Sequence, residues 1–123
     1  MIDTAHGEAL EHIAERVAKL NSKWWVDLET GKPIERNVGE LLMLCTSELA
    51  EAMEGHRKSL MDDKLPQYKM FDVEIVDTLI RLFDIAGHMI PDFGEIFEAK
   101  MGFNSVRHDH TIEGRKETNG KKY

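Results

Sequence analysis

The segment from residue 71 to residue 86 constrains the fold more than any other part of the chain. Its apolar side chains recur with helical spacing and cover most of the circumference of the helix that they predict. They are Phe71, Val73, Ile75, Val76, Leu79, Ile80, Leu82, Phe83, Ile85 and Ala86. Such a helix lies at the centre of a bundle or at an interface between subunits. We therefore expect a central helix over Tyr68–His88 in an all-α fold that oligomerises.

Three more helices are expected around this one. Apolar residues at helical spacing indicate a helix over Thr4–Leu20, with Asp3 as its N-cap. Asn37 is a second good N-cap, and Glu40 stands at the capping-box position of a helix that continues to residue 55 or 56. Pro91 opens a shorter helix. No stretch alternates in the way a strand does, so the sequence predicts a bundle of about four helices.

The remaining segments are expected to be irregular. Residues 21–36 hold the turn signal Glu29-Thr30-Gly31-Lys32-Pro33 and few periodic positions.

The domain organisation follows from the length of the chain. Residues 1–107 are expected to form one domain of ordinary size. Residues 108–123 are polar and contain Gly114 and Gly120, which is typical of a flexible tail.

The net charge and the cysteine content limit the partners and the cellular compartment that we expect for the protein. The chain carries a formal net charge of -7, which argues against a broad basic face for duplex nucleic acid. Cys45 is the only cysteine, so an intrachain disulfide is excluded and a buried structural thiol in a reducing cytoplasm is favoured. The chain starts without an apolar signal segment, and no run approaches the ~18 apolar residues of a membrane span. We expect a cytoplasmic protein without a membrane partner.

Four acidic residues suggest a metal site. Glu48 and Glu51 stand three apart on one predicted helix, and Glu74 and Asp77 repeat this spacing on the next. Residues at this spacing share a helix face, where like charges repel unless a cation neutralises them. Oxygen ligands alone suit Mg²⁺ or Mn²⁺. No glutamate is followed by histidine three residues later, which argues against a di-iron bundle.

An exposed charged face is the alternative interpretation of these acids. Asp77, Arg81 and Asp84 have the spacing of a solvated stripe with local ion pairs. Glu48, in contrast, stands beside the apolar face of its helix, where a carboxylate needs a partner.

Three blocks of residues resemble the MazG-like family of all-α nucleoside triphosphate pyrophosphohydrolases. Ser47-Glu48-Leu49-Ala50-Glu51 and Glu74-Ile75-Val76-Asp77 are similar to the Glu-x-x-Glu and Glu-x-x-Asp blocks of that family. The segment Lys100–Arg107 is similar to its Lys-x-x-x-Asn-x-x-Arg ending, so the resemblance covers residues 38–107. One departure is Ser47, where many members carry an additional glutamate.

The resemblance implies a function and a site. It implies hydrolysis of a nucleoside or deoxynucleoside triphosphate to the monophosphate and pyrophosphate, with Mg²⁺ (or Mn²⁺ in its place) held by Glu48, Glu51, Glu74 and Asp77. Glu48 and Glu51 are the catalytic candidates, and Glu51 is our choice for the residue that also activates water. The protein is expected to associate with itself as a homodimer or homotetramer, as related enzymes do.

Further residues are candidates for binding the substrate. Lys100, Asn104 and Arg107 have the spacing of one helical face and form a phosphate and sugar clamp in this interpretation, or a solvated helix end in the alternative one. Trp24 or Trp25 is expected to stack on the nucleobase, or else to cap the core.

Other functions stay open at this point. One alternative keeps the chemistry and changes the substrate, as in a phage-type diphosphohydrolase specific for one dNTP such as dGTP, or a phosphoribosyl-ATP pyrophosphohydrolase. The alternative of another class is a non-catalytic helical module that binds a partner through an apolar interface.

Overall fold

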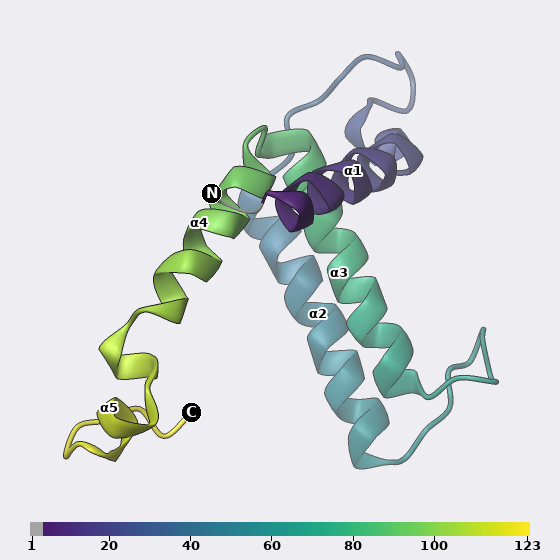
Figure 1. Cartoon of the computed structure of the whole chain (residues 1–123). Coiled ribbons are helices and arrows are strands. Elements are labelled where there is room, and N and C mark those ends of the chain that lie inside the picture. Colours follow the sequence, from purple (N-terminus) through teal and green to yellow (C-terminus); the bar gives the residue numbers. More distant parts are fainter. Residues whose placement is uncertain (1–3) are drawn as a thin grey trace. The chain divides into compact units, whose positions relative to one another are not determined.

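The computed structural model of the chain describes residues 4–123 (Figure 1). Its helices are α1 (Ala5–Leu20), α2 (Val38–Arg57), α3 (Met70–Met89), α4 (Phe93–Ser105) and the short α5 (Ile112–Lys116), with 3₁₀ turns η1 (Ser22–Trp25) and η2 (His108–His110). The described residues form no strand, only the isolated bridges Val26–Pro33 and Met61–Lys69. The all-α prediction is confirmed, and the predicted bounds of the long helices are correct to within two residues. The expected N-cap Asp3 lies outside the described residues.

The fold divides into two compact units, which are described separately. One unit contains residues 4–12 and 92–123, and the other contains residues 13–91. None of the helices among the described residues is long and apolar enough to cross a membrane.

Antiparallel α2 and α3 dominate the unit of residues 13–91 (Figure 1). As the sequence predicts, Asn37 caps α2, because its side chain accepts a hydrogen bond from the backbone N–H of Glu40 at 3.0 Å. Close packing at Gly55 brings the two helices together at the connecting loop. A Cβ atom on Gly55 would lie 2.7 Å from the Cβ of Met70, so only glycine fits there.

A second close approach joins the end of α1 to α3. A Cβ atom on Gly87 would lie 2.4 Å from the carbonyl oxygen of Ala14 and 2.6 Å from the Cβ of Ala18. Both alanines are buried. Small residues on the two helices therefore allow α1 to lie directly against the last turns of α3.

A repeated motif, Gly-Glu-x-x-Glu, organises the other unit. It occurs at the start of α1 as Gly7–Glu11 and at the start of α4 as Gly94–Glu98. Glu98 accepts a hydrogen bond from the backbone N–H of Gly7 at 2.7 Å, and Glu11 accepts one from Gly94 at 3.1 Å. Because the first turn of a helix leaves its N–H groups unpaired, each helix caps the other. Sequence analysis did not detect this repeat.

The C-terminal segment contains more structure than a flexible tail was expected to have. Thr111 caps α5 by accepting a hydrogen bond from the backbone N–H of Gly114 at 3.0 Å. His108 contacts Glu117 across α5, with 2.6 Å between Nε2 and Oε1. Residues 108–116 thus form two short helical elements.

Candidate metal centre

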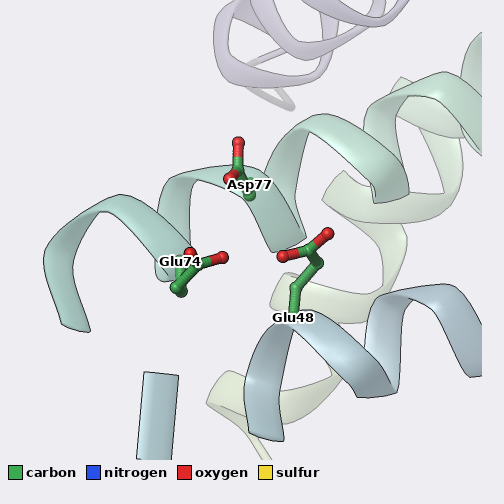
Figure 2. A group of neighbouring side chains, drawn as sticks. All are labelled: Glu48, Glu74 and Asp77. Carbon is green, nitrogen blue, oxygen red and sulfur yellow. The ribbon is translucent and has the colours of Figure 1, made fainter. Parts of the chain in front are cut away.

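Three of the four predicted metal ligands come together in the structure. Glu48 extends from α2 toward Glu74 and Asp77 on α3 (Figure 2). One carboxylate oxygen from each residue lies within 4.8 Å of the others. The spacing of three residues places Glu74 and Asp77 on one face of α3, and the packing of α2 against α3 brings Glu48 opposite them. We call these three residues the carboxylate triad.

Glu51 lies at the edge of the triad and not in it. It stands one turn after Glu48 on α2, and its side chain is exposed. It is nonetheless close enough to act on the triad, because its negative charge contributes to the raised pKa of Glu74.

Glu74 is the most buried member of the triad. Its residue is only 7% exposed, and its Oε2 atom has no hydrogen-bond partner among the described residues. Burial, a hydrogen bond with Glu48 and the charges of the neighbouring acids raise the pKa of Glu74 to about 8. A buried acceptor without a partner is costly, so a site that leaves one is suited to a bound cation.

The pKa values of the other two acids of the triad are shifted in opposite directions. Burial, the charge of Glu48 and the charge of Asp62 raise the pKa of Asp77. Burial opposes ionisation of Glu48 too, but hydrogen bonds with Glu74 and Arg81 lower its pKa below the ordinary value. Arg81 donates from Nε to Oε1 of Glu48 at 2.8 Å. Without a cation, the triad thus favours a protonated Glu74 beside an ionised Glu48.

Asp62 is an acid that sequence analysis missed. It lies in the loop between α2 and α3 and is 6% exposed. Its Oδ2 atom accepts hydrogen bonds from the backbone N–H groups of Lys64 and Leu65 at 3.1 and 2.8 Å. The pair Asp62-Asp63 is a turn signal in the sequence, and only the fold shows that Asp62 is near Asp77.

A cavity of about 490 Å³ adjoins the triad. Glu48 and Asp77 line it, together with Asn21, Trp24, Arg36, Leu44, Ile80, Arg81 and Asp84. Trp24 is 62% exposed, so its ring is available to a ligand. The cavity places an aromatic surface and two guanidinium groups beside two of the carboxylates.

Trp25 has a different role, because it anchors residues 21–36 to α3. Its indole N–H donates to Asp84 at 3.1 Å from Oδ2, and its ring stacks on His88 with 4.0 Å between centroids. Asp84 is 7% exposed. The alternative of a solvated stripe over Asp77, Arg81 and Asp84 is therefore wrong for Asp84, because Trp25 and His88 contact its carboxylate.

The predicted phosphate clamp is assembled differently from the expectation. Lys100 and Asn104 lie on α4, but Arg107 lies beyond its end at Ser105, so the prediction of one helical face is wrong for Arg107. The three side chains still gather. Lys100 and Arg107 lie over the ring of Phe103, 5.0 and 5.3 Å from its centroid, and Nη1 of Arg107 is 3.5 Å from Oδ1 of Asn104.

The single cysteine is buried, as expected. Burial raises the pKa of its thiol, which does not favour a nucleophilic role for Cys45.

The clamp belongs to the unit of residues 4–12 and 92–123, whereas the carboxylate triad belongs to the unit of residues 13–91.

No protein-family model, curated protein or solved structure matches the chain.

Proposed function

We propose that the chain is a magnesium-dependent nucleoside triphosphate pyrophosphohydrolase of the MazG-like type. The carboxylate triad is the observation that supports this proposal best. Glu48, Glu74 and Asp77 offer oxygens within 4.8 Å of one another, and the buried Oε2 atom of Glu74 has no partner among the described residues. This donor set is all oxygen, so it suits Mg²⁺, with Mn²⁺ as a substitute.

The charges of site and substrate explain why a cation is needed. A triphosphate and a group of carboxylates repel each other, so they meet only across divalent cations. When bound, Mg²⁺ supplies an acidic water and stabilises charge on the leaving pyrophosphate. Glu48, Glu74 and Asp77 would hold the cation, and the exposed Glu51 would orient the attacking water and accept its proton.

Two groups of residues, one in each unit, are assigned to recognition of the nucleotide in this proposal. Trp24 lines the cavity beside Glu48 and Asp77 and provides the surface on which the base stacks. Lys100, Asn104 and Arg107 bind phosphate and sugar oxygens in the same proposal.

Substitution of the two tryptophans distinguishes these roles. We expect Trp24→Ala to raise KM for the preferred nucleotide about ten-fold, since stacking of a base on an aromatic contributes ~1–3 kcal/mol. Its melting temperature should stay close to wild type, because Trp24 is 62% exposed.

The matched control is Trp25→Phe. It removes the hydrogen bond to the buried Asp84 and should cost about 1–3 kcal/mol of stability. Steady-state kinetics and thermal melting measure both effects. Unchanged KM in Trp24→Ala would assign base recognition elsewhere.

A substrate panel tests the proposed function. Each of the common ribo- and deoxynucleoside triphosphates, together with phosphoribosyl-ATP, is incubated with the protein and Mg²⁺, and pyrophosphate is measured. Release of pyrophosphate from one dNTP such as dGTP indicates a phage-type diphosphohydrolase specific for that dNTP. Release from phosphoribosyl-ATP indicates a phosphoribosyl-ATP pyrophosphohydrolase. Excess EDTA should stop the reaction. No release from any compound and no Mg²⁺ binding would indicate the non-catalytic interaction module.

We also propose that the protein is a homo-oligomer. Apolar side chains on α3 stay uncovered, with exposed fractions from 37% at Ile75 to 52% at Val76, and Met43 and Met53 on α2 are 64% and 58% exposed. Such a surface is suited to a second copy of the chain. Sedimentation at micromolar concentration should give at least twice the 14.1 kDa mass of one chain. A stable and active species of that single mass is the contrary result.

A further inference from the structure

Two cationic side chains, Arg107 and Lys121, pair with the carboxylate of Asp109, and a third, Lys100, lies over the same ring as Arg107. Arg107 contacts Asp109 with both ends of its guanidinium group, from Nε to Oδ1 at 3.0 Å and from Nη2 to Oδ2 at 2.7 Å. Nζ of Lys121 lies 2.9 Å from the same Oδ2 atom. Lys100 shares the ring of Phe103 with Arg107. We call Lys100, Arg107 and Lys121 the cationic cluster.

The backbone of the last residues is fixed in a way that positions Lys121. Arg115 on α5 donates hydrogen bonds to the carbonyl oxygens of Lys121 and Lys122, at 3.2 and 2.7 Å. A Cβ atom on Gly120 would lie 2.3 Å from the carbonyl oxygen of Arg115, so the chain approaches α5 more closely than other residues allow. Lys121 is therefore held beside Arg107 by contacts other than its own ion pair.

The cluster keeps an excess of positive charge and unused donors. Two cations, Arg107 and Lys121, face the single carboxylate of Asp109, and their contacts hold it ionised by lowering its pKa. Lys100 adds a third positive charge over the ring of Phe103 that it shares with Arg107. An ammonium group has three N–H donors, and Lys121 uses one of them in its contact with Asp109. The side chains of Arg107 and Lys121 are 24% and 52% exposed, so a ligand in solvent can reach them. Neighbouring cations repel one another, and a multiply charged anion relieves that repulsion.

We infer that Arg107 and Lys121, positioned by Asp109, form a binding site for a polyphosphate group, to which the last residues of the chain contribute Lys121. The identification of this group with the triphosphate of the substrate rests on the proposed function. Asp109 is a positioning residue, because it aligns the guanidinium fork of Arg107 and brings Lys121 to it. The segment after residue 107 is then part of the binding machinery and not only a polar tail.

Direct binding of inorganic tripolyphosphate tests this inference without relying on catalysis. Calorimetric titration of the full chain in Mg²⁺-free buffer compares wild type with Lys121→Gln, Lys121→Arg and Lys122→Gln. Lys122 is the matched control, because its neutralisation changes the net charge equally and leaves the contact with Asp109 in place. We expect Lys121→Gln to weaken binding about ten-fold and Lys121→Arg to retain it. Lys122→Gln should change affinity less than about two-fold, as expected for an exposed charge.

The outcomes separate this site from the enzyme. Equal affinities of Lys121→Gln and Lys122→Gln would overturn the inference, as would absence of tripolyphosphate binding by wild type. Melting curves of all variants show whether Lys121→Gln has lost affinity through unfolding, and retention of affinity by Lys121→Arg supports a role of charge at this position. Binding of tripolyphosphate by a wild-type protein that hydrolyses no nucleotide would support the site and overturn the proposed function. Hydrolysis with unchanged KM in Lys121→Gln would support the proposed function and overturn the polyphosphate site.

Discussion

Asp77→Asn and Glu48→Gln should each reduce pyrophosphate release by a factor on the order of 10³ or more, because each removes one charged ligand from the proposed cation site. Both substitutions keep the shape of the side chain, so the helical content should not change. The two residues belong to different helices, α3 and α2, and contribute oxygens to the same point. Equal losses from two positions on different helices are expected of a shared site.

The matched control for this experiment is Glu54→Gln. Glu54 also lies on α2, but it pairs with Arg57 and Lys58 outside the triad. Its neutralisation should leave turnover within about two-fold of wild type, because exposed ion pairs contribute little. Glu48→Gln additionally removes the partner of Arg81, whose side chain is 40% exposed and can be hydrated. Near wild-type rates in both triad variants would place the site elsewhere.

Local signals in the sequence predicted the helices well. Apolar periodicity located the long helices, and Asn37 marked the start of α2 because an N-cap acts through neighbours close in sequence. The spacing of Glu74 and Asp77 predicted a shared face for the same reason. These features depend on interactions within one or two helical turns.

The missing parts depend on contacts between distant segments. The sequence around Asp84 does not show that this residue is buried, because its hydrogen-bond donor, Trp25, lies 59 residues earlier. Asp62 belongs to a turn by its sequence, and the packing of the loop brings it near Asp77. The two Gly-Glu-x-x-Glu motifs are 87 residues apart, and their reciprocal capping exists only where α1 crosses α4. Arg107 was placed on a helical face because nothing in its spacing shows that α4 ends at Ser105.

The stability of the protein without a cation should fall as pH rises from 6 to 8.5. Glu74 is the reason, because its pKa is raised from the ordinary 4.5 to about 8 in the folded state. A group with a raised folded pKa binds more protons when folded than when unfolded. Its contribution to stability is complete below its unfolded pKa and is lost as pH rises through the folded pKa. Glu48 has a lowered pKa, so its contribution changes on the acid side of this window.

Thermal melting in EDTA at pH 6 and pH 8.5 measures the effect, which should be on the order of 2–3 kcal/mol for wild type. Glu74→Gln is the control, because it keeps a neutral group at this position while the residues outside the triad titrate as before. The variant should be more stable than wild type at pH 8.5 and should lose the part of the pH dependence that belongs to Glu74. In the proposed site Mg²⁺ would replace the proton as the partner of the buried carboxylate, so it should stabilise wild type more at pH 8.5 than at pH 6, and Glu74→Gln much less at either pH. The same pH dependence in wild type and Glu74→Gln would show that the carboxyl of Glu74 is ionised in the folded protein throughout this range, and the case for a cation at this point of the helix pair would lose its electrostatic basis.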